Sequence, residues 1–457
     1  MCGKYVIKVD VRVCLMEYTS RARGLFMSTD TKFPREGIWA MGLIKYAAAR
    51  VNTELGFLKP EVGSAVMNVA RRLMNGEYDG EITVDVHQTG SGTGLNMNVN
   101  EVISRHVNTE YGINAHPNDH VNLGQSSNDV VPSAIRVSAV KPYLDSLRPA
   151  LLNMIRVMEE KGGEFNNVVK AGRTHLRDAL PITLGQEFSA YIDAFKHDLS
   201  LLDSVIDYVK ELPIGGTAVG TGINTHPDFG NRVVKVINEE TNLGFRRANS
   251  FRAMKLLTDL LSLSSMLRSL SMDLYRLCQD IRLMFSGPFT GLNEVDIPTQ
   301  GEVAGSSIMP GKVNPVTVES ALQAVSTVIG LDEANMMAAM LGEFELSMGI
   351  PLMGYNVVRQ VRILTETVGK LSSLVIREMR PNVERMRHYA ESTSALVTLI
   401  SPIIGYEKTS ELAKQLKEGY SIRDILLKLG YTEDEVNRIL NLEELTKPGI
   451  KLRGIDK

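Results

Sequence analysis

Residues 250–286 read SFRAMKLLTDLLSLSSMLRSLSMDLYRLCQDIRLMFS and contain neither glycine nor proline, the residues that most often end a helix. Apolar side chains recur along this run at helical spacing, among them Leu257, Leu261, Leu270 and Leu274. A helix of this length would measure about 55 Å. It can bury its apolar stripe only against helices of similar length. The run therefore predicts a mainly α-helical fold built around a bundle of long helices.

Three further segments, residues 186–212, 316–341 and 357–379, show the same helical spacing of apolar residues. The apolar stripes are wide, and pairs such as Leu256-Leu257 make them two residues deep. One bundle of four helices would leave part of this apolar surface exposed to water. We therefore expect the bundle to be completed by oligomerisation.

Composition excludes several classes of protein. The chain has 457 residues, which predicts more than one domain. Its formal net charge is −3, and it has no basic excess of the kind that nucleic-acid binding requires. No apolar run reaches the roughly 18–20 residues of a membrane helix, and no secretory signal opens the chain. We expect neither a nucleic acid nor a membrane as a partner.

The three cysteines, Cys2, Cys14 and Cys278, are too few and too scattered for a disulfide framework. Sparse, unpaired cysteines are typical of a reducing compartment, so we expect a cytoplasmic protein. Three thiolates could in principle hold an iron–sulfur cluster. The spacings of 12 and 264 residues, with no motif beside any of them, favour the absence of a cluster.

Glycine-rich polar stretches separate the predicted helices, and the longest of them reads GEVAGSSIMPGKVNP at residues 301–315. It is close to a phosphate-binding P-loop. However, five residues separate Gly305 from Gly311 where four are required, and Val313 replaces the magnesium-binding Ser or Thr. We reject a nucleotide site. What remains is a loop with backbone N–H groups, two hydroxyls and Lys312, or else a plain surface loop.

Two other stretches carry clustered hydroxyl groups. QTGSGTGLNMNVN at residues 88–100 places Ser91 and Thr93 between glycines, where successive N–H groups can form an anion-binding nest. A turn followed by helix-capping residues explains it equally well. GQSSND at residues 124–129 precedes another predicted helix. Capping accounts for one or two of its polar residues but not for all four.

GRTHLRD at residues 172–178 holds His175 directly after Thr174, and we expect His175 to begin a further helix. A single histidine is more often structural than catalytic. No metal-ligand spacing and no cysteine nucleophile accompany these stretches. Taken together, hydroxyls, amides, N–H groups and one lysine suit a small carboxylate ligand.

At this point the residues carry a family resemblance. GSSIMPGKVNP at residues 305–315 resembles the signature loop of the fumarase/aspartase superfamily. Other stretches resemble family motifs in the same order, from about residue 33 to residues 405–431. They are TGSGTGLNMNVNEV at 89–102, HPNDHVN at 116–122, QSSND at 125–129, GRTHLRDALPITLGQE at 172–187 and GGTAVGTGIN at 215–224.

Within that superfamily the chain is most similar to class II fumarases. Aspartases usually have Gln in place of His175, an SST-like sequence at residues 126–128 and Ala in place of Gly311. The resemblance implies reversible hydration of fumarate to (S)-malate by anti addition of water, a step of the tricarboxylic acid cycle. Aspartate ammonia-lyase is the alternative. A non-catalytic scaffold with this fold is disfavoured, because Ser306, His175, Lys312 and Glu319 are all present.

The resemblance also implies roles for individual residues. Ser306 would be the base that removes a proton from C3 of malate, and His175 would activate water in the hydration direction. Glu319 would pair with His175 and tune it. The residues expected to hold the two carboxylates are Ser91, Gly92, Thr93, Ser126, Ser127, Asn128, Thr174, Ser307, Lys312, Val313 and Asn314.

The resemblance implies no cofactor, and it implies a homotetramer whose active sites each combine motifs from three subunits. The three-domain fold of the family predicts an N-terminal extension at residues 1–15 and domains at 16–125, 126–387 and 388–457. A second dicarboxylate site would involve His116, Pro117, Asn118 and Asp119. The arginine expected three residues before His116 is Ile113 here, which argues against that second site.

Overall fold

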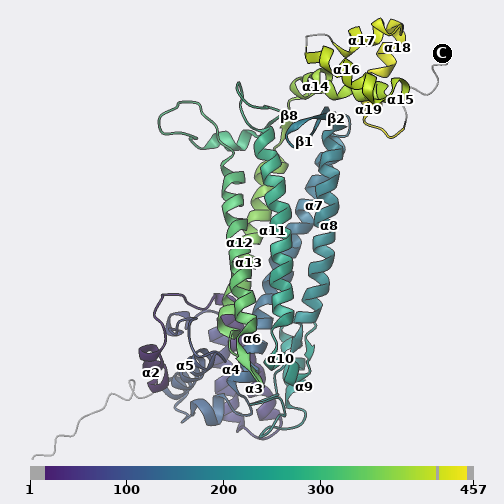
Figure 1. The fold of residues 1–457 in the computed structure, drawn as a ribbon. Helices are drawn as coiled ribbons and strands as arrows, with labels where there is room; N and C mark the ends of the chain where they lie inside the picture. The colour runs from purple at the N-terminus through teal and green to yellow at the C-terminus, as the bar shows by residue number, and fades with distance from the viewer. Residues whose placement is uncertain (1–15, 418–420, 450–457) are drawn as a thin grey trace, which may run out of the picture. The chain divides into compact units, whose positions relative to one another are not determined.

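The computed structural model describes residues 16–417 and 421–449. The predicted extension at residues 1–15, with Cys2 and Cys14, lies outside the described residues. Helices make up most of the described chain, and its strands are short pairs (Figure 1). The prediction of a mainly α-helical fold is confirmed.

The predicted long helices are present, except that residues 250–286 form two helices instead of one. Two of the three further segments are confirmed to within three residues at each end. The third begins earlier than expected and ends in a π-helical turn at Leu371–Ile376. The long helices are α7 (Arg148–Glu164), α8 (Leu184–Val209), α11 (Thr258–Met284), α12 (Val316–Met340) and α13 (Ile350–Lys370).

The other helices of the described chain are shorter or lie outside the long-helix region. They are α2 (Glu17–Leu25), α3 (Arg35–Glu54), α4 (Pro60–Met74), α5 (Thr93–Tyr111), α6 (Ser127–Pro142), α9 (Phe229–Thr241), α10 (Ser250–Lys255), α14 (Val383–Ser392), α15 (Ser401–Ile404), α16 (Tyr406–Lys417), α17 (Ile422–Lys428), α18 (Glu433–Ile439) and α19 (Leu442–Leu445). Short 3-10 or π-helical turns also occur, at Asp79–Glu81, Pro117–Val121, Tyr143–Leu147, Pro298–Glu302 and Ser394–Ile400.

The strands of the described residues pair two by two, and one pair is parallel. The antiparallel pairs are β1 (Val169–Thr174) with β2 (Arg177–Thr183), β5 (Val295–Asp296) with β8 (Arg380–Pro381), and β6 (Gly342–Glu343) with β7 (Leu346–Ser347). The parallel pair is β3 (Glu211–Leu212) with β4 (Arg246–Arg247).

The glycine- and proline-free run does not form one helix, so that prediction was wrong in one detail. α10 ends before Leu256, whose backbone is extended (φ −114°, ψ 135°), and α11 begins two residues later. The guanidinium of Arg136 donates to the Leu256 carbonyl oxygen at 3.4 Å and pairs with Asp259, Nε to Oδ2 at 2.7 Å. Both charged side chains are fully buried. We attribute the break to this guanidinium, because a buried charge must find acceptors.

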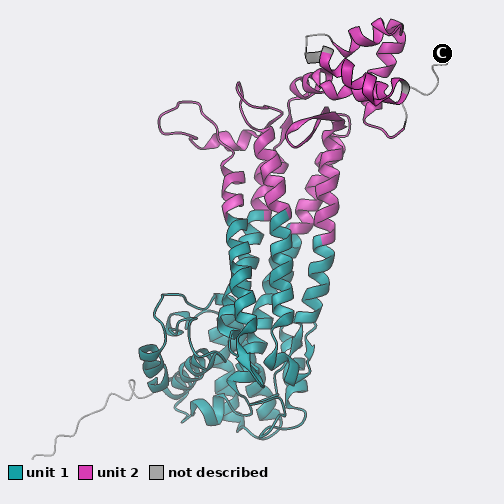
Figure 2. Ribbon diagram, viewed as in Figure 1, with its two compact units in different colours: residues 1–150, 198–272, 324–367 teal, residues 151–197, 273–323, 368–457 magenta. Residues whose placement is uncertain are grey.

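The described residues form two compact units, drawn in different colours in Figure 2. Each unit is discontinuous in sequence. The domain boundaries expected after residues 125 and 387 remain predictions. Of the described residues, unit 1 comprises 16–150, 198–272 and 324–367, and unit 2 comprises 151–197, 273–323, 368–417 and 421–449.

In unit 1, α3 packs against α4, α6 and α9, and its side chains Met41, Leu43 and Ile44 are fully buried. Hydrogen bonds between buried side chains join the long helices of the unit. Ser264 in α11 donates to Asp332 in α12, at 2.6 Å from Oγ to Oδ1. Paired in this way, the buried polar groups fix how neighbouring helices align along their length.

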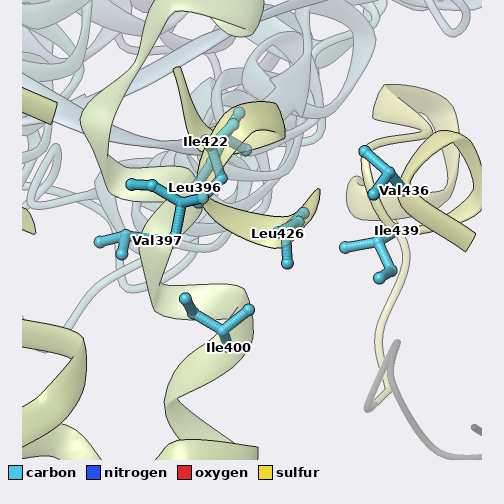
Figure 3. Packing of buried hydrophobic residues seen from close by; sticks show 8 residues of the cluster. Leu396, Val397, Ile400, Ile422, Leu426, Val436 and Ile439 are labelled. Atoms are coloured by element: carbon cyan, nitrogen blue, oxygen red, sulfur yellow. The ribbon is translucent and has the colours of Figure 1, made fainter. Parts of the chain in front are cut away.

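In unit 2, the chain after α14 has a hydrophobic cluster of its own, shown in Figure 3. Helix α18 of this region opens with a capping box formed by Thr432 and Glu435. The buried members of the cluster are Leu396, Val397, Ile400, Ile422, Ile425, Leu426, Val436 and Ile439.

Within the described ranges, every helix falls short of the combined length and apolar character that crossing a lipid bilayer requires.

Candidate active site

A chain of three hydroxyl groups lies at the start of α5 in unit 1. Ser91 Oγ is 2.7 Å from Thr93 Oγ1, which is 2.8 Å from Ser127 Oγ at the start of α6. Gly92, the residue before α5, has φ +75°, and a Cβ there would lie 2.6 Å from Val131 Cγ1. Only glycine fits this turn without displacing α6, so Gly92 sets the distance between the two helix starts.

In the QSSND segment, some side chains have structural hydrogen bonds, and the Ser127 hydroxyl remains for ligand binding. Ser126 and Asp129 form a capping box at the start of α6. Asn128 Nδ2 donates to the Ala218 carbonyl oxygen at 2.8 Å. Capping therefore explains two of the four residues Ser126–Asp129, as the sequence indicated, and the Ser127 hydroxyl joins the chain described above.

Asp129 also holds the glycine-rich stretch after β3 in place. Its Oδ2 accepts the backbone N–H groups of Gly215, at 2.8 Å, and Thr217, at 3.1 Å. Burial raises the pKa of this carboxyl to about 6, and the backbone N–H groups and Lys45 oppose that rise. The carboxylate therefore aligns two segments of unit 1 beside the hydroxyl chain.

These segments enclose a cleft of 410 Å³ in unit 1, large enough for a four-carbon diacid. Sequence reasoning missed several of its polar residues, and two of these have an unpaired atom. Asn96 Oδ1 and Thr217 Oγ1 are buried and, among the described residues, have no hydrogen-bond partner. Unpaired buried polar groups at a cleft indicate a ligand or water. The lining residues are Thr93, Asn96, Met97, Asn122, Gly124, Gln125, Ser126, Ser127, Thr217, Ala218, Ile223 and Asn224.

The signature loop at residues 305–315 belongs to unit 2, and hydrogen bonds join its two ends. Gly305 N donates to the Lys312 carbonyl oxygen at 3.2 Å, and Asn314 Nδ2 donates to the Gly305 carbonyl oxygen at 2.6 Å. At its centre, Ser306 Oγ accepts the backbone N–H groups of Ile308, at 3.2 Å, and Met309, at 3.1 Å. Two donors on one hydroxyl oxygen favour negative charge on that oxygen.

The other loop residues face solvent or a neighbouring cavity. Lys312, Val313, Asn314 and Glu319 line a cavity of 490 Å³ within unit 2, while Ser307 is exposed. The Lys312 ammonium makes no ion pair with any residue that the structure describes. It is therefore available to an incoming carboxylate.

His175 does not begin a helix, so that expectation was wrong. Thr174 pairs with Arg177 across the β1–β2 hairpin, and His175 and Leu176 form its two-residue tip. Both tip residues have φ +55°, as a type I′ turn requires. Residues other than Gly, Asn or Asp rarely adopt this backbone conformation, and such strain tends to occur at functional sites. Both side chains are exposed.

Charged groups at the base of the hairpin hold it in place. Glu294 is fully buried, and its Oε1 lies 2.9 Å from Nη1 of Arg173, the residue before Thr174. Lys170 of β1 also lies 3.6 Å from Glu294 and pairs with Glu187 of α8. These contacts fix the strand that carries the strained tip.

The expected second dicarboxylate site has a structural use in this chain. His116 Nδ1 accepts the N–H groups of Asn118, at 3.3 Å, and Asp119, at 3.2 Å, and so caps the turn at Pro117–Val121. This contact occupies one nitrogen of the ring. A role of the segment in binding a dicarboxylate remains a prediction.

The structure of one chain thus groups the expected site residues by unit. Within the described residues, His175 and Glu319 make no hydrogen bond to each other, so their pairing also remains a prediction. In those ranges no cluster of three or more His, Cys, Asp or Glu side chains is arranged to hold a metal ion. Unit 1 holds Ser91, Gly92, Thr93, Ser126, Ser127 and Asn128, and unit 2 holds Thr174, His175, Ser306, Ser307, Lys312, Val313, Asn314 and Glu319.

Comparison with known proteins gives consistent matches. The sequence matches a family described as lyase over residues 3–330 and one described as fumarase C C-terminus over residues 396–447. A class II fumarate hydratase of Saccharolobus solfataricus is 58% identical over 434 residues, covering 95% of this chain and 99% of that protein. One from Corynebacterium efficiens is 40% identical over 444 residues, covering 96% and 93%.

Solved structures agree with the sequence matches. A class II fumarase from Schistosoma mansoni superposes with a TM-score of 0.90 at 33% identity, covering 94% of this chain and 95% of that one. A fumarate lyase/delta crystallin from Brucella melitensis gives a TM-score of 0.88 at 34% identity, with the same coverage. Together with the long helices and the hydroxyl-rich segments at their ends, these matches identify a lyase of the fumarase/aspartase superfamily. Within it, the chain belongs to the class II fumarate hydratase family.

Proposed function

We propose that this chain catalyses the reversible hydration of fumarate to (S)-malate by anti addition of water. The observation that carries the proposal is the hydroxyl chain of Ser91, Thr93 and Ser127 beside a 410 Å³ cleft. Neutral hydroxyls can donate to a carboxylate without protonating it. The identity of 58% to a class II fumarate hydratase over nearly the whole chain supports the same reaction.

In the dehydration direction, Ser306 acts as the base that removes a proton from C3 of malate. A serine hydroxyl is a weak base, so its oxygen must be held as the alkoxide. The N–H groups of Ile308 and Met309, which it accepts in this structure, supply that stabilisation.

Loss of the C3 proton places a second negative charge on the neighbouring carboxylate. The reaction is fast only if donors meet this charge in the transition state. The Lys312 ammonium and the Asn314 amide are the proposed donors, and one such donor is worth about 3–4 kcal/mol. Ser307 and the loop N–H groups add to them.

The hydroxide leaves C2 from the opposite face, which makes the elimination anti. His175 donates the proton that turns the departing hydroxide into water, and in hydration it takes a proton from the attacking water. Glu319 pairs with His175 and tunes it for this proton transfer. Protons and electron pairs balance without an electron carrier, so the proposed reaction needs no cofactor.

The two carboxylates are held by the residues that resemble the family's binding motifs. Hydroxyl and amide donors come from side chains, and Gly92 and Val313 contribute through the backbone. The proposed set is Ser91, Gly92, Thr93, Ser126, Ser127, Asn128, Thr174, Ser307, Lys312, Val313 and Asn314.

The proposed assembly is a homotetramer in which each active site combines motifs from three subunits. In unit 1, the end of α12 exposes Met336, Met337 and Met340, and Phe344 beyond it is 80% exposed. Apolar surface of this extent is typical of an interface. The proposed setting is the tricarboxylic acid cycle in the cytoplasm, which suits the sparse cysteines.

Fumarate added to the purified protein should form malate at the same rate with and without excess ammonium. A chelator should not change this rate either. The loss of fumarate absorbance measures the reaction, and the Ser306→Ala variant serves as the inactive control. Fast, ammonium-dependent consumption of fumarate would instead identify an aspartate ammonia-lyase.

A further inference from the structure

Lys45 is a buried cation that the proposed mechanism does not use. It lies in α3, and its side chain is fully buried. Its Nζ donates to Asn122 Oδ1 at 2.8 Å and to Gln125 Oε1 at 2.9 Å. Both acceptors are neutral, and no carboxylate of the described residues lies within ion-pair distance of Nζ. Burying an ammonium without a paired anion is costly and is seldom retained without a function.

The two acceptors connect Lys45 to the cleft. Asn122 and Gln125 both line the 410 Å³ space beside Ser126 and Ser127. Their amide nitrogens donate to carbonyl oxygens of the same loop, as in Gln125 Nε2 to the Val121 carbonyl oxygen at 3.1 Å. Lys45 therefore fixes the loop that leads into the hydroxyl segment. Its positive charge is separated from the cleft only by the side-chain amides of Asn122 and Gln125.

One charged group of a neighbouring helix, the carboxylate of Asp129, acts on the pKa of Lys45. Burial lowers the pKa of Lys45 to about 7, and the charge of Asp129 in α6 works against that decrease. The oxygens of Asp129 already accept three backbone N–H groups, and burial also lowers the pKa of Arg247, which faces Asp129.

Two ion pairs join charged side chains of α3 and of the helices that pack on it. Arg71 of α4 pairs with Glu240 of α9, and Arg50 of α3 pairs with Glu239 of α9. Neither pair includes Lys45, and no described carboxylate forms an ion pair with it. The cleft is therefore where the missing negative charge can be supplied.

We infer that Lys45 is a positioning and specificity-determining residue: its buried charge selects a dianionic ligand over a monoanionic one in the cleft, and its two hydrogen bonds hold the loop before Ser126. The inference rests on the proposed function, in which the ligand is a dicarboxylate. Asn96 Oδ1 and Thr217 Oγ1, unpaired in the same cleft, are further contacts for such a ligand or its bound water.

The test compares succinate, a dianion, with monomethyl succinate, a monoanion, by calorimetry. Lys45→Met should weaken succinate binding by at least about tenfold and should weaken monoester binding much less. The matched control is Lys59→Met, which removes an exposed lysine and should change neither affinity. Equal losses for both ligands would mean that Lys45 acts only through structure, and that result would overturn the electrostatic inference.

A second measurement does not depend on how Lys45→Met folds. A dianion bound near Lys45 raises its pKa, so succinate binding should take up a proton at pH 8. This pH is well above the pKa of Asp129, which is about 6, so Asp129 is already ionised before the ligand binds. Calorimetry in two buffers of different ionisation enthalpy measures the uptake, in a His175→Asn background that removes the alternative proton acceptor of the proposed mechanism. Binding without proton uptake contradicts the inference.

Failure of the inference and failure of the proposed function are distinguishable. If the wild-type protein does not hydrate fumarate but the His175→Asn variant binds succinate with proton uptake, the proposed function fails and the inference stands. If the wild-type protein hydrates fumarate but the variant binds succinate without uptake, the inference alone fails. Absence of succinate binding would overturn the inference as well.

Discussion

Replacement of Ser306 by alanine is expected to lower kcat for malate dehydration about 10³-fold. The reason is that the alanine leaves the C3 proton without an acceptor, while the N–H groups of Ile308 and Met309 lose the oxygen that they bind. The measurement is the steady-state rate of fumarate formation from malate. Affinity for succinate should change much less than kcat, because the base contributes mainly in the transition state.

The matched control for this variant is Ser373→Ala. Ser373 is an exposed serine in the π-helical turn after α13, and its hydroxyl donates only to the carbonyl oxygen of Gly369. Its loss should leave kcat unchanged. Near-normal turnover of Ser306→Ala, in a protein with unchanged oligomeric state, would remove Ser306 as the base.

Replacement of Asp259 by alanine is expected to lower the free energy of unfolding by about 3–5 kcal/mol, since it leaves the Arg136 guanidinium buried without its anion. Asp259 accepts two N–H groups of Arg136, Nε at 2.7 Å and Nη2 at 3.0 Å, and both side chains are fully buried. Guanidinium denaturation followed by helical circular dichroism, at one fixed protein concentration, measures the change.

Two controls separate the buried charge from a general loss of contacts. The double variant Arg136→Met/Asp259→Leu should recover most of the lost stability, because it removes both charges. Glu160→Ala breaks the exposed Arg156–Glu160 pair and should cost less than about 1 kcal/mol. A loss of that small size for Asp259→Ala would contradict the explanation given for the break before α11.

The long helices could be predicted from the sequence because their apolar spacing is a local property. The interruption at Leu256 could not, because it depends on Arg136, a residue more than 100 positions earlier. Propensity alone continues the helix across a Lys-Leu-Leu-Thr sequence. A buried guanidinium that needs a carbonyl oxygen overrides that preference.

The position of His175 shows a similar limit. Thr-His-Leu-Arg contains no Asn-Gly or Asp-Gly, the usual signals of a two-residue hairpin. The tip is nevertheless held in positive φ by the strands, which Glu294 anchors through Arg173. The glycine Gly172 permits the close approach of the strands, since a Cβ there would lie 2.6 Å from the Leu180 carbonyl oxygen.

The hydroxyl residues of the cleft were within reach of the sequence because they cluster in short motifs. Thr217 and Asn96 also belong to such motifs, but nothing in their spacing separates a ligand-facing side chain from a structural one. The burial of Lys45 could not be predicted from the sequence, since a lysine in a helix is usually exposed. Its burial becomes visible only when α3 is packed against α6 and the loop before Ser126.

The central proposal is that the Ser306 loop of one subunit and the Ser126–Asn128 segment of another act in the same dicarboxylate site. Mixing Ser306→Ala with Ser127→Ala, which removes a proposed carboxylate donor and should also lower turnover strongly, tests it most directly, by co-expression or by joint refolding. If each site draws these segments from different subunits, mixed tetramers should regain about a quarter of wild-type activity, because about a quarter of the sites then contain both serines. Mixtures that stay as inactive as the two parents would contradict the claim.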